Sequence, residues 1–257
     1  VQRMIGGQFQ SAGCCICGLD EKVRAEIKFE TRSVLSSKGA ESVFIMFIGV
    51  NRPTSYFQER GGEHMFYTPS RQGLGETHIG ERQSLIDNFE DRSREEILDW
   101  LDKFINFNTF EVSIPALRDP ALAPEGQTGI SISCLFDYSL VEKIEKAGWY
   151  DDFKEIMEDR IIRIFSETIF KGWDNDILFK FSSTPLTINK ESGSSEGAIT
   201  GWSFETDIPV IDTLKDIPKS VLTSIPEVLK AGQWAYAPSG VPIAMLTGWY
   251  SAQKIIK

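Results

Sequence analysis

The chain has 257 residues, of which 41% are hydrophobic and 25% are charged, as in globular proteins that bury a substantial core. Its formal net charge of −10 excludes an extended nucleic-acid-binding surface, because phosphate recognition needs clustered Lys and Arg. No apolar run reaches the roughly 18 residues of a membrane span, so we expect no transmembrane segment.

Four cysteines occur in the chain, at positions 14, 15, 17 and 134. The first three lack the two-residue gap of paired zinc ligands, so we predict buried, reduced thiols, no metal site and a cytoplasmic protein. His64 and His78 are the two histidines, and neither has a ligand-like spacing. We expect both to lie in loops without a catalytic partner.

Apolar or alternating runs predict five strands, near residues 10–18, 42–50, 108–114, 129–136 and 176–182. The second of these is apolar at nearly every position, which predicts a central strand that is covered on both faces. Ser93 and Glu96 form a capping box before a helical stripe, so we predict a helix over 93–106. A second capping box, Ser139 with Glu142, begins a helical region that resumes over 150–170.

The C-terminal residues 228–257 predict a strand, a tight turn and a helix in that order. Val228 to Ala231 is a short apolar run that ends at Gly232, and Ser239 is a suitable N-cap for the helix that follows. Pro242 suits the first turn, where the missing amide has no intrahelical partner. Free amides at such a helix start favour an anion or the edge of an electron-rich heterocycle. A helix that closes a sheet without binding anything remains the alternative.

The stretch AGQWAYAPSGVPIAMLTGWYSAQKI resembles the C-terminal signature of FAD-dependent oxidoreductases related to phytoene desaturases and carotenoid isomerases, in the amine-oxidase-type superfamily. In that family an Ala-Gly strand end, a Gly-Val-Pro turn and a helical Ser/Thr-Gly pair surround the isoalloxazine. Their counterparts in this chain are Ala231-Gly232, Gly240-Val241-Pro242 and Thr247-Gly248. A second match is Asp119-Pro120 through Ala123-Pro124 to Gly126, which is similar to the family's Asp-Pro-x-x-Ala-Pro-x-Gly motif.

The resemblance implies an α+β fold with two parts. Residues 1–190 would form a substrate-binding domain with a mixed β-sheet covered by helices. Residues 191–257 would supply the C-terminal strand and helix of a Rossmann-like FAD-binding domain whose N-terminal part is absent. The glycines at 73, 75 and 80 are wrongly spaced for a dinucleotide-binding fingerprint, and we therefore expect a piece of a longer protein.

The resemblance also implies the site residues. The flavin end of FAD would contact Gly232, Gln233, Ser239, Gly240, Val241 and Pro242 in the complete protein. Gln233 stands where many relatives carry an acidic residue. The aromatic residues that flank these segments either line an apolar substrate tunnel or pack in the core, and both readings stay open: Trp202, Phe204, Trp234 and Tyr236. No catalytic residue is identified.

No paired carboxylates, nucleophile elbow or histidine–acid pair is recognisable, which is compatible with flavoenzymes because the cofactor supplies the hard chemistry. We therefore expect the C-terminal portion of a desaturase, isomerase or saturase that acts on an apolar small molecule, such as a polyene or isoprenoid. Peripheral membrane contact of the full-length protein stays open. The alternative is a non-catalytic module that binds an apolar ligand or a partner without the cofactor. We expect the chain alone to be inactive.

Overall fold

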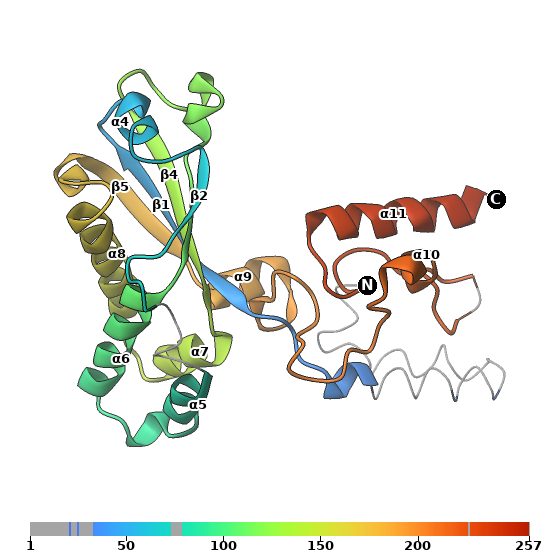
Figure 1. Ribbon diagram of the computed structural model, residues 1–257. Coiled ribbons are helices and arrows are strands. Elements are labelled where there is room, and N and C mark those ends of the chain that lie inside the picture. The colour runs from blue at the N-terminus through green and yellow to red at the C-terminus, as the bar shows by residue number, and fades with distance from the viewer. Residues whose placement is uncertain (1–20, 22–24, 26–32, 73–78, 226, 257) are drawn as a thin grey trace. The chain divides into compact units, whose positions relative to one another are not determined.

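The computed structural model describes residues 21, 25, 33–72, 79–225 and 227–256 (Figure 1). It divides into two compact units: unit 1 contains Val1–Ser42 and Thr187–Lys257, and unit 2 contains Val43–Leu186. The predicted strand near 10–18, the cysteines at 14, 15 and 17, the glycines at 73 and 75, and His78 lie outside the described residues. The assignment of the two parts to substrate and cofactor stays a prediction.

Unit 2 is built on a five-stranded sheet in the order β2-β3-β4-β1-β5. The strands are β1 (Ser42–Val50), β2 (His64–Tyr67), β3 (Phe110–Ser113), β4 (Thr128–Phe136) and β5 (Ile177–Ser183). The pairs β1–β5, β2–β3 and β3–β4 are antiparallel, so the expected mixed sheet is corrected to an antiparallel one. Residues 114–127 join β3 to β4 and contain only two 3-10 turns, η3 (Pro115–Leu117) and η4 (Pro120–Leu122). The short connection lets β4 pair directly with β3 in antiparallel fashion.

Helices α6 (Arg94–Phe107), α7 (Tyr138–Lys146) and α8 (Tyr150–Glu167) lie on one side of this sheet (Figure 1). The shorter elements of the unit are α4 (Thr54–Gln58), α5 (Ile79–Asp87), η2 (Phe89–Asp91) and η5 (Trp173–Asp176). Alternate strand residues enter the core against the helices: Phe44, Met46, Ile48, Val50, Ile130, Ile132, Cys134 and Phe136. The four from β1 are at most 2% exposed, and their burial stabilises the unit by roughly 6–12 kcal/mol as an upper bound.

The second face of β1 is less covered than its sequence predicted. Ile45 and Phe47 are only half-buried there, whereas Gly49 is buried because the ring of Phe179 lies over it. Phe47 stacks on Phe181 of β5 with ring centroids 5.1 Å apart. The continuous apolar run of β1 therefore marks a strand with one helix-covered face and one face that carries aromatic side chains.

The helix starts of unit 2 test the two predicted capping boxes. The first is confirmed: Ser93 Oγ accepts from Glu96 N, and Ser93 N donates to the Glu96 carboxylate. The second is wrong, because α7 begins at Tyr138, two residues earlier than a Ser139 cap allows. Asp137 is its N-cap and accepts a hydrogen bond from Leu140 N at 3.1 Å.

This difference predicts unequal costs for two identical substitutions. Ser93→Ala should lower the free energy of unfolding by about 1 kcal/mol, because it removes a cap from α6. Ser139→Ala should change it by less than about 0.5 kcal/mol, because Asp137 still caps α7. Urea unfolding of both variants is the measurement. Equal losses in the two would contradict the assignment of the caps.

Cys134 is a free thiol on the core face of β4, and burial raises its pKa from 9.0 to about 12. A pKa raised in the folded state means that the fold holds the proton more tightly than the unfolded chain does. The contribution to stability is therefore lost as the pH rises above about 9.

We accordingly expect Cys134 to resist iodoacetamide in the folded protein at neutral pH, because the reactive species is the thiolate. The same thiol should be alkylated once urea unfolds the chain. Mass spectrometry of the peptide that contains residue 134 separates this thiol from the other cysteines. Alkylation at equal rates with and without urea would contradict its burial.

Unit 1 has little regular structure in its described part apart from α11 (Val241–Ile256). Other elements are α9 (Pro185–Ser192), which spans the boundary of the units, η6 (Ser195–Gly197), η7 (Leu214–Asp216) and α10 (Ile217–Ser220), and residues 33–36 are also helical. Isolated bridges join Gly39 to Trp202, Ile211 to Tyr236 and Leu222 to Leu229. Its small core contains Ala198, Trp202, Trp234 and Ala237.

The strand predicted at Val228 to Ala231 is therefore wrong. Leu229 makes one bridge to Leu222, and Lys230 N donates to Val221 O at 2.8 Å, with no ladder beyond these contacts in the described residues. A four-residue segment such as this, with three apolar residues and Lys230, forms a strand only where a neighbouring strand pairs with it. No Rossmann-like part is recognisable in the described portion of unit 1. Among the described helices, none is both long enough and apolar enough to cross a membrane.

Candidate functional site

The start of α11 presents unpaired backbone donors beside a buried hydroxyl. Ala244 N donates to Gly240 O at 2.9 Å, so Gly240, and not Ser239, occupies the N-cap position. The hydroxyl of Ser239 is buried and has no hydrogen-bond partner among the described residues, so its predicted role as a cap is wrong. No described hydrogen bond uses the amides of Gly240, Val241 or Ile243. Pro242 lies in the first turn, as predicted.

The loop before this helix is held by two hydroxyls of α11. Gly232 N donates to Thr247 Oγ1 at 3.1 Å, and Ser251 Oγ donates to Lys230 O at 3.0 Å. Thr247 is fully buried, and Gly232 has a φ of 97°, a backbone conformation that favours glycine. In the expected Thr-Gly pair it is therefore Thr247 that fixes the loop. A Cβ placed on Gly248 would meet no described atom within 4 Å, so no close packing is seen there.

Gln233 fixes the other end of the loop. Its side-chain amide donates to Ser194 Oγ and to Ala198 O, both at 3.4 Å. Ser194 is 3% exposed and itself donates to Ala198 O at 2.7 Å. These hydrogen bonds give Gln233 a structural role, because they hold its loop to residues 194–198 of unit 1. Its contact with a cofactor stays a prediction.

Three of the four predicted substrate-lining aromatics are core residues in this unit. Trp202 Nε1 donates to Trp234 O at 3.1 Å, and the two rings meet edge to face at 4.8 Å. Tyr236 is 1% exposed and its hydroxyl donates to Asp212 O at 2.8 Å; burial, with a smaller effect of the Asp212 charge, raises its pKa. Phe204 alone presents its ring outward, with 64% of its surface exposed.

Gly201 allows two segments of unit 1 to approach each other closely. Its φ is 85°, and a Cβ there would lie 2.3 Å from the carbonyl oxygen of Gln233. Gly201 O accepts from Ala40 N at 2.7 Å, so the residue also joins the start of the unit to its end. The position of the Gln233 loop therefore depends on the absence of a side chain at 201.

We expect Gly201→Ala to lower stability by about 2–4 kcal/mol, because a left-handed backbone costs about 1 kcal/mol in alanine and the clash adds to it. Gly193→Ala is the matched control in the same unit. Its φ is 67°, but a Cβ there meets nothing within 4 Å. Chemical denaturation should show the loss in Gly201→Ala to be clearly larger. Equal losses would mean that the close approach does not constrain the loop.

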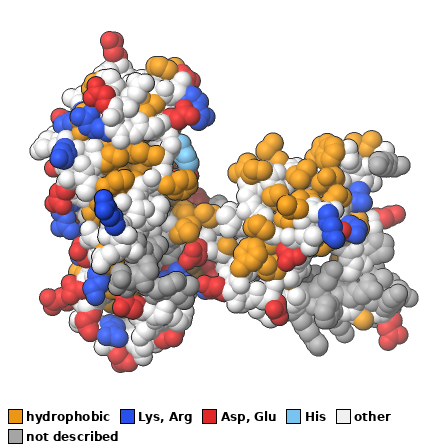
Figure 2. Space-filling model, viewed as in Figure 1, with side chains coloured by type: hydrophobic (Ala, Val, Ile, Leu, Met, Phe, Trp, Pro, Cys, Tyr) orange, Lys and Arg blue, Asp and Glu red, His pale blue; other side chains and the backbone are white. Residues whose placement is uncertain are grey.

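A second candidate surface is the face of the unit 2 sheet opposite its helices. Exposed apolar side chains lie on this face, and Figure 2 shows hydrophobic side chains gathered on the visible side of this unit. The most exposed are Phe66 (69%), Leu135 (50%), Phe179 (57%) and Phe181 (54%). An exposed apolar area on a sheet face is typical of a ligand-binding or contact surface.

His64 and Glu111 form a pair on the same face, and this corrects the prediction of a loop histidine without a partner. His64 is the first residue of β2 and its Nε2 lies 2.7 Å from Glu111 Oε1. Ser133 Oγ of β4 donates to the second carboxylate oxygen at 3.5 Å. Cross-strand pairing brings together residues that are 47 positions apart. The one signal in the sequence is the alternation of His64 and Phe66 along a short strand.

The described residues contain no cluster of three or more His, Cys, Asp or Glu side chains that would hold a metal ion. His64 and Glu111 form a hydrogen-bonded acid–base pair.

Comparison with known proteins gives a partial match to one class of enzyme. No protein-family model matches the chain. Over 83 residues, 32% of the chain, it is 32% identical to prolycopene isomerase 2, chloroplastic, from an Oncidium hybrid cultivar. Prolycopene isomerase 1, chloroplastic, of the same plant matches with the same identity and coverage. The aligned stretch spans only 14% of each of these relatives. The resemblance found in the sequence is confirmed to this extent.

Proposed function

We propose that the protein is part of a flavin-dependent oxidoreductase that acts on an apolar polyene or isoprenoid, in the manner of the carotenoid isomerase-related enzymes. The observation that carries this proposal is the partial similarity to prolycopene isomerases. Because those relatives are named as isomerases, isomerisation is favoured over desaturation or saturation. FAD is the proposed cofactor.

The start of α11 suits the flavin end of FAD. The unpartnered hydroxyl of Ser239 and the unused amides of Gly240 and Val241 supply hydrogen-bond donors in one place. A Cβ on Gly240 would come no closer to another atom than 3.9 Å, which leaves room beside the helix start. When bound, FAD accepts or donates hydride. The residues of this chain would orient its ring and favour negative charge through the positive end of the helix dipole.

The exposed sheet face of unit 2 suits an apolar substrate. Its aromatic side chains offer contact area without charge, and the rings of Phe47 and Phe181 are stacked with centroids 5.1 Å apart. We assign unit 2, Val43–Leu186, to substrate binding and the C-terminal part of unit 1 to the cofactor. The predicted division into residues 1–190 and 191–257 differs from these units, since residues 1–42 group with the C-terminal part in unit 1. A cytoplasmic location and peripheral membrane contact stay predictions.

A second proposal is a module that binds an apolar ligand without FAD. It is favoured by the absence of a recognisable Rossmann-like part among the described residues. The two proposals differ in one property, because only the first requires bound flavin in the complete protein.

We expect Gly240→Asp to lower the reduction potential of the bound flavin in the complete protein. The carboxylate would oppose the negative charge of the reduced ring by about 1 kcal/mol, or about 20 mV for two electrons. Aspartate is a favourable N-cap residue, so the helix should form normally. An anaerobic redox titration of both proteins is the measurement.

Ala252→Asp is the matched control, since Ala252 is exposed on the same helix about 18 Å further along. It adds the same charge and should leave the potential unchanged. An unchanged potential in Gly240→Asp, with FAD bound, would refute the placement of the flavin. Complete absence of FAD from the wild-type protein would instead favour the cofactor-free module.

A further inference from the structure

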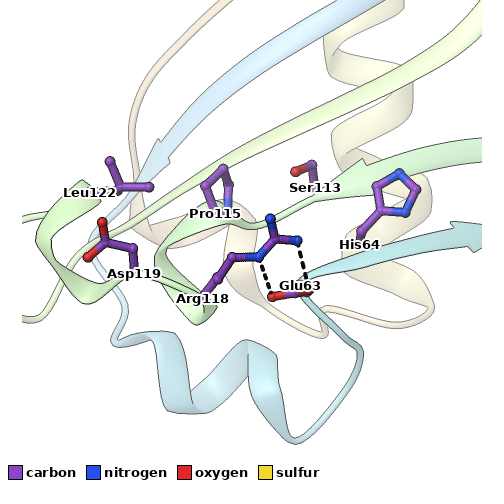
Figure 3. Close-up of a pocket in the computed structure, with 7 residues that line it drawn as sticks. All are labelled: Glu63, His64, Ser113, Pro115, Arg118, Asp119 and Leu122. Atoms are coloured by element: carbon purple, nitrogen blue, oxygen red, sulfur yellow. Dashed lines mark hydrogen bonds and ion pairs between the residues drawn. The ribbon is translucent and has the colours of Figure 1, made fainter. Parts of the chain in front are cut away.

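A cavity of about 230 Å³ lies at one end of the exposed sheet face of unit 2 (Figure 3). Its wall is formed by the first residue of β2, the last of β3 and the two 3-10 turns that follow, with side chains from Glu63, His64, Ser113, Arg118, Asp119 and Leu122. Arg118 donates through Nε and Nη2 to both oxygens of Glu63, at 3.0 and 2.8 Å. A solvent-exposed ion pair therefore borders the cavity on one side, with 74% of the Arg118 side chain exposed.

His64 and Ser113 connect this cavity to the aromatic part of the sheet face. They are paired across β2 and β3, and the adjacent pair, Met65 with Val112, points into the core. Because side chains alternate between the faces of a sheet, His64 and Ser113 point to the exposed side. The next pairs across the sheet, Ser113 with Ser131 and Glu111 with Ser133, lie on the same side.

The exposed face carries aromatic rings on β5 and β1 and mainly polar side chains on β3, with Phe66 of β2 and Leu135 of β4 as exposed apolar exceptions. Phe179 and Phe181 lie on β5, and Phe47 lies on β1 beside them. Ser131 and Ser133 lie on β4 and Ser113 lies on β3. Glu111 of β3 contacts His64 of β2, whose ring also meets the ring of Phe66 edge to face at 5.5 Å. Three strand spacings, about 14 Å, separate β1 from β2. An elongated molecule lying across the strands would have one end on aromatic rings and the other at the cavity.

We propose that this cavity binds the hydroxyl end of an elongated isoprenoid alcohol, which makes the substrate an alcohol and not a pure hydrocarbon. This inference rests on the proposed function of the sheet face. Three carboxylates, those of Glu63, Glu111 and Asp119, lie in or beside the cavity, with the one guanidinium of Arg118 paired to the first. A carboxylate end would be repelled there.

A hydroxyl suits the groups that remain. His64 Nε2 is engaged by Glu111, and no described hydrogen bond uses its Nδ1. No described hydrogen bond uses the hydroxyl of Ser113 either. An alcohol donates one hydrogen bond and accepts another, so it is able to donate to the His64 ring nitrogen and to accept from Ser113. Pro115 and Leu122 supply an apolar wall for the adjoining carbon atoms.

The test is binding of four probes with the same C15 chain to the purified protein: farnesol, farnesene, farnesoic acid and farnesylamine. Isothermal titration in detergent-free buffer with a low co-solvent content gives the affinities. Farnesol should bind about tenfold more tightly than farnesene, as expected for one or two added hydrogen bonds. The imidazole proton resonances of His64, assigned with His64→Gln, should shift on addition of farnesol.

Variants test whether His64 and Ser113 cause the preference for farnesol over farnesene. Ser113→Ala combined with His64→Gln should reduce the preference for farnesol over farnesene to twofold or less, while farnesene binding stays unchanged. Ser131→Ala is the matched control, because this serine lies on the same face but does not line the cavity. It should leave the preference at about tenfold. Circular dichroism of each variant checks that the fold is retained.

Several results would overturn the inference. Equal affinity for farnesol and farnesene, tighter binding of the acid or the amine, or an unchanged preference in the double variant would each do so. With farnesene still bound, these results leave the proposed apolar-substrate function intact. If none of the four probes binds, both this inference and the assignment of the sheet face to the substrate are wrong, whereas the flavin placement at Gly240 is tested separately by its redox titration.

Discussion

The sheet of unit 2 buries one face under α6, α7 and α8, and the use of the other face follows from that burial. The rings of Phe44 and Phe136 of the sheet lie 6.3 and 5.7 Å from the ring of Phe153 of α8, centroid to centroid, in a core that excludes water from one side. Such burial fixes strand register, since a shift by one residue would exchange the two faces. The register in turn sets Phe47 against Phe181 and His64 near Glu111 on the exposed side. The core and the proposed ligand-contact surface thus lie on opposite faces of the same strands.

Unit 1 is organised differently, through hydrogen bonds between loops and a single long helix. Thr247 and Ser251 hold the loop before α11, Gln233 holds it to the segment at 194–198, and Gly201 lets the backbones approach. These contacts fix the helix start without using its first amides. A helix terminus whose donors are left unused by the surrounding chain is suited to an anionic or electron-rich ligand.

Local signals predicted the elements of unit 2 well, because its strands and helices carry their own patterns. The stripe after Ser93 and the alternation in β4 are confirmed by α6 and by the core positions of that strand. Two kinds of error have a physical cause. The pattern of Ser139 and Glu142 predicts a cap at Ser139, but Asp137, two residues earlier, makes the hydrogen bond, since capping residues that lie close together compete. Val228 to Ala231 formed no strand because strand formation depends on a partner that local sequence does not reveal.

The site was predictable only where family resemblance or local chemistry pointed to it. Pro242 lies in the first turn of α11, but the pair of His64 and Glu111 depends on the pairing of a four-residue edge strand. The central claim, flavin-dependent chemistry on an apolar polyene, is tested most directly by turnover. The protein expressed from its complete gene, with reduced FAD and a cis-polyene under anaerobic conditions, should change the geometry or number of double bonds, as resolved by chromatography and mass spectrometry. An unaltered polyene in the presence of stoichiometrically bound FAD would contradict the account.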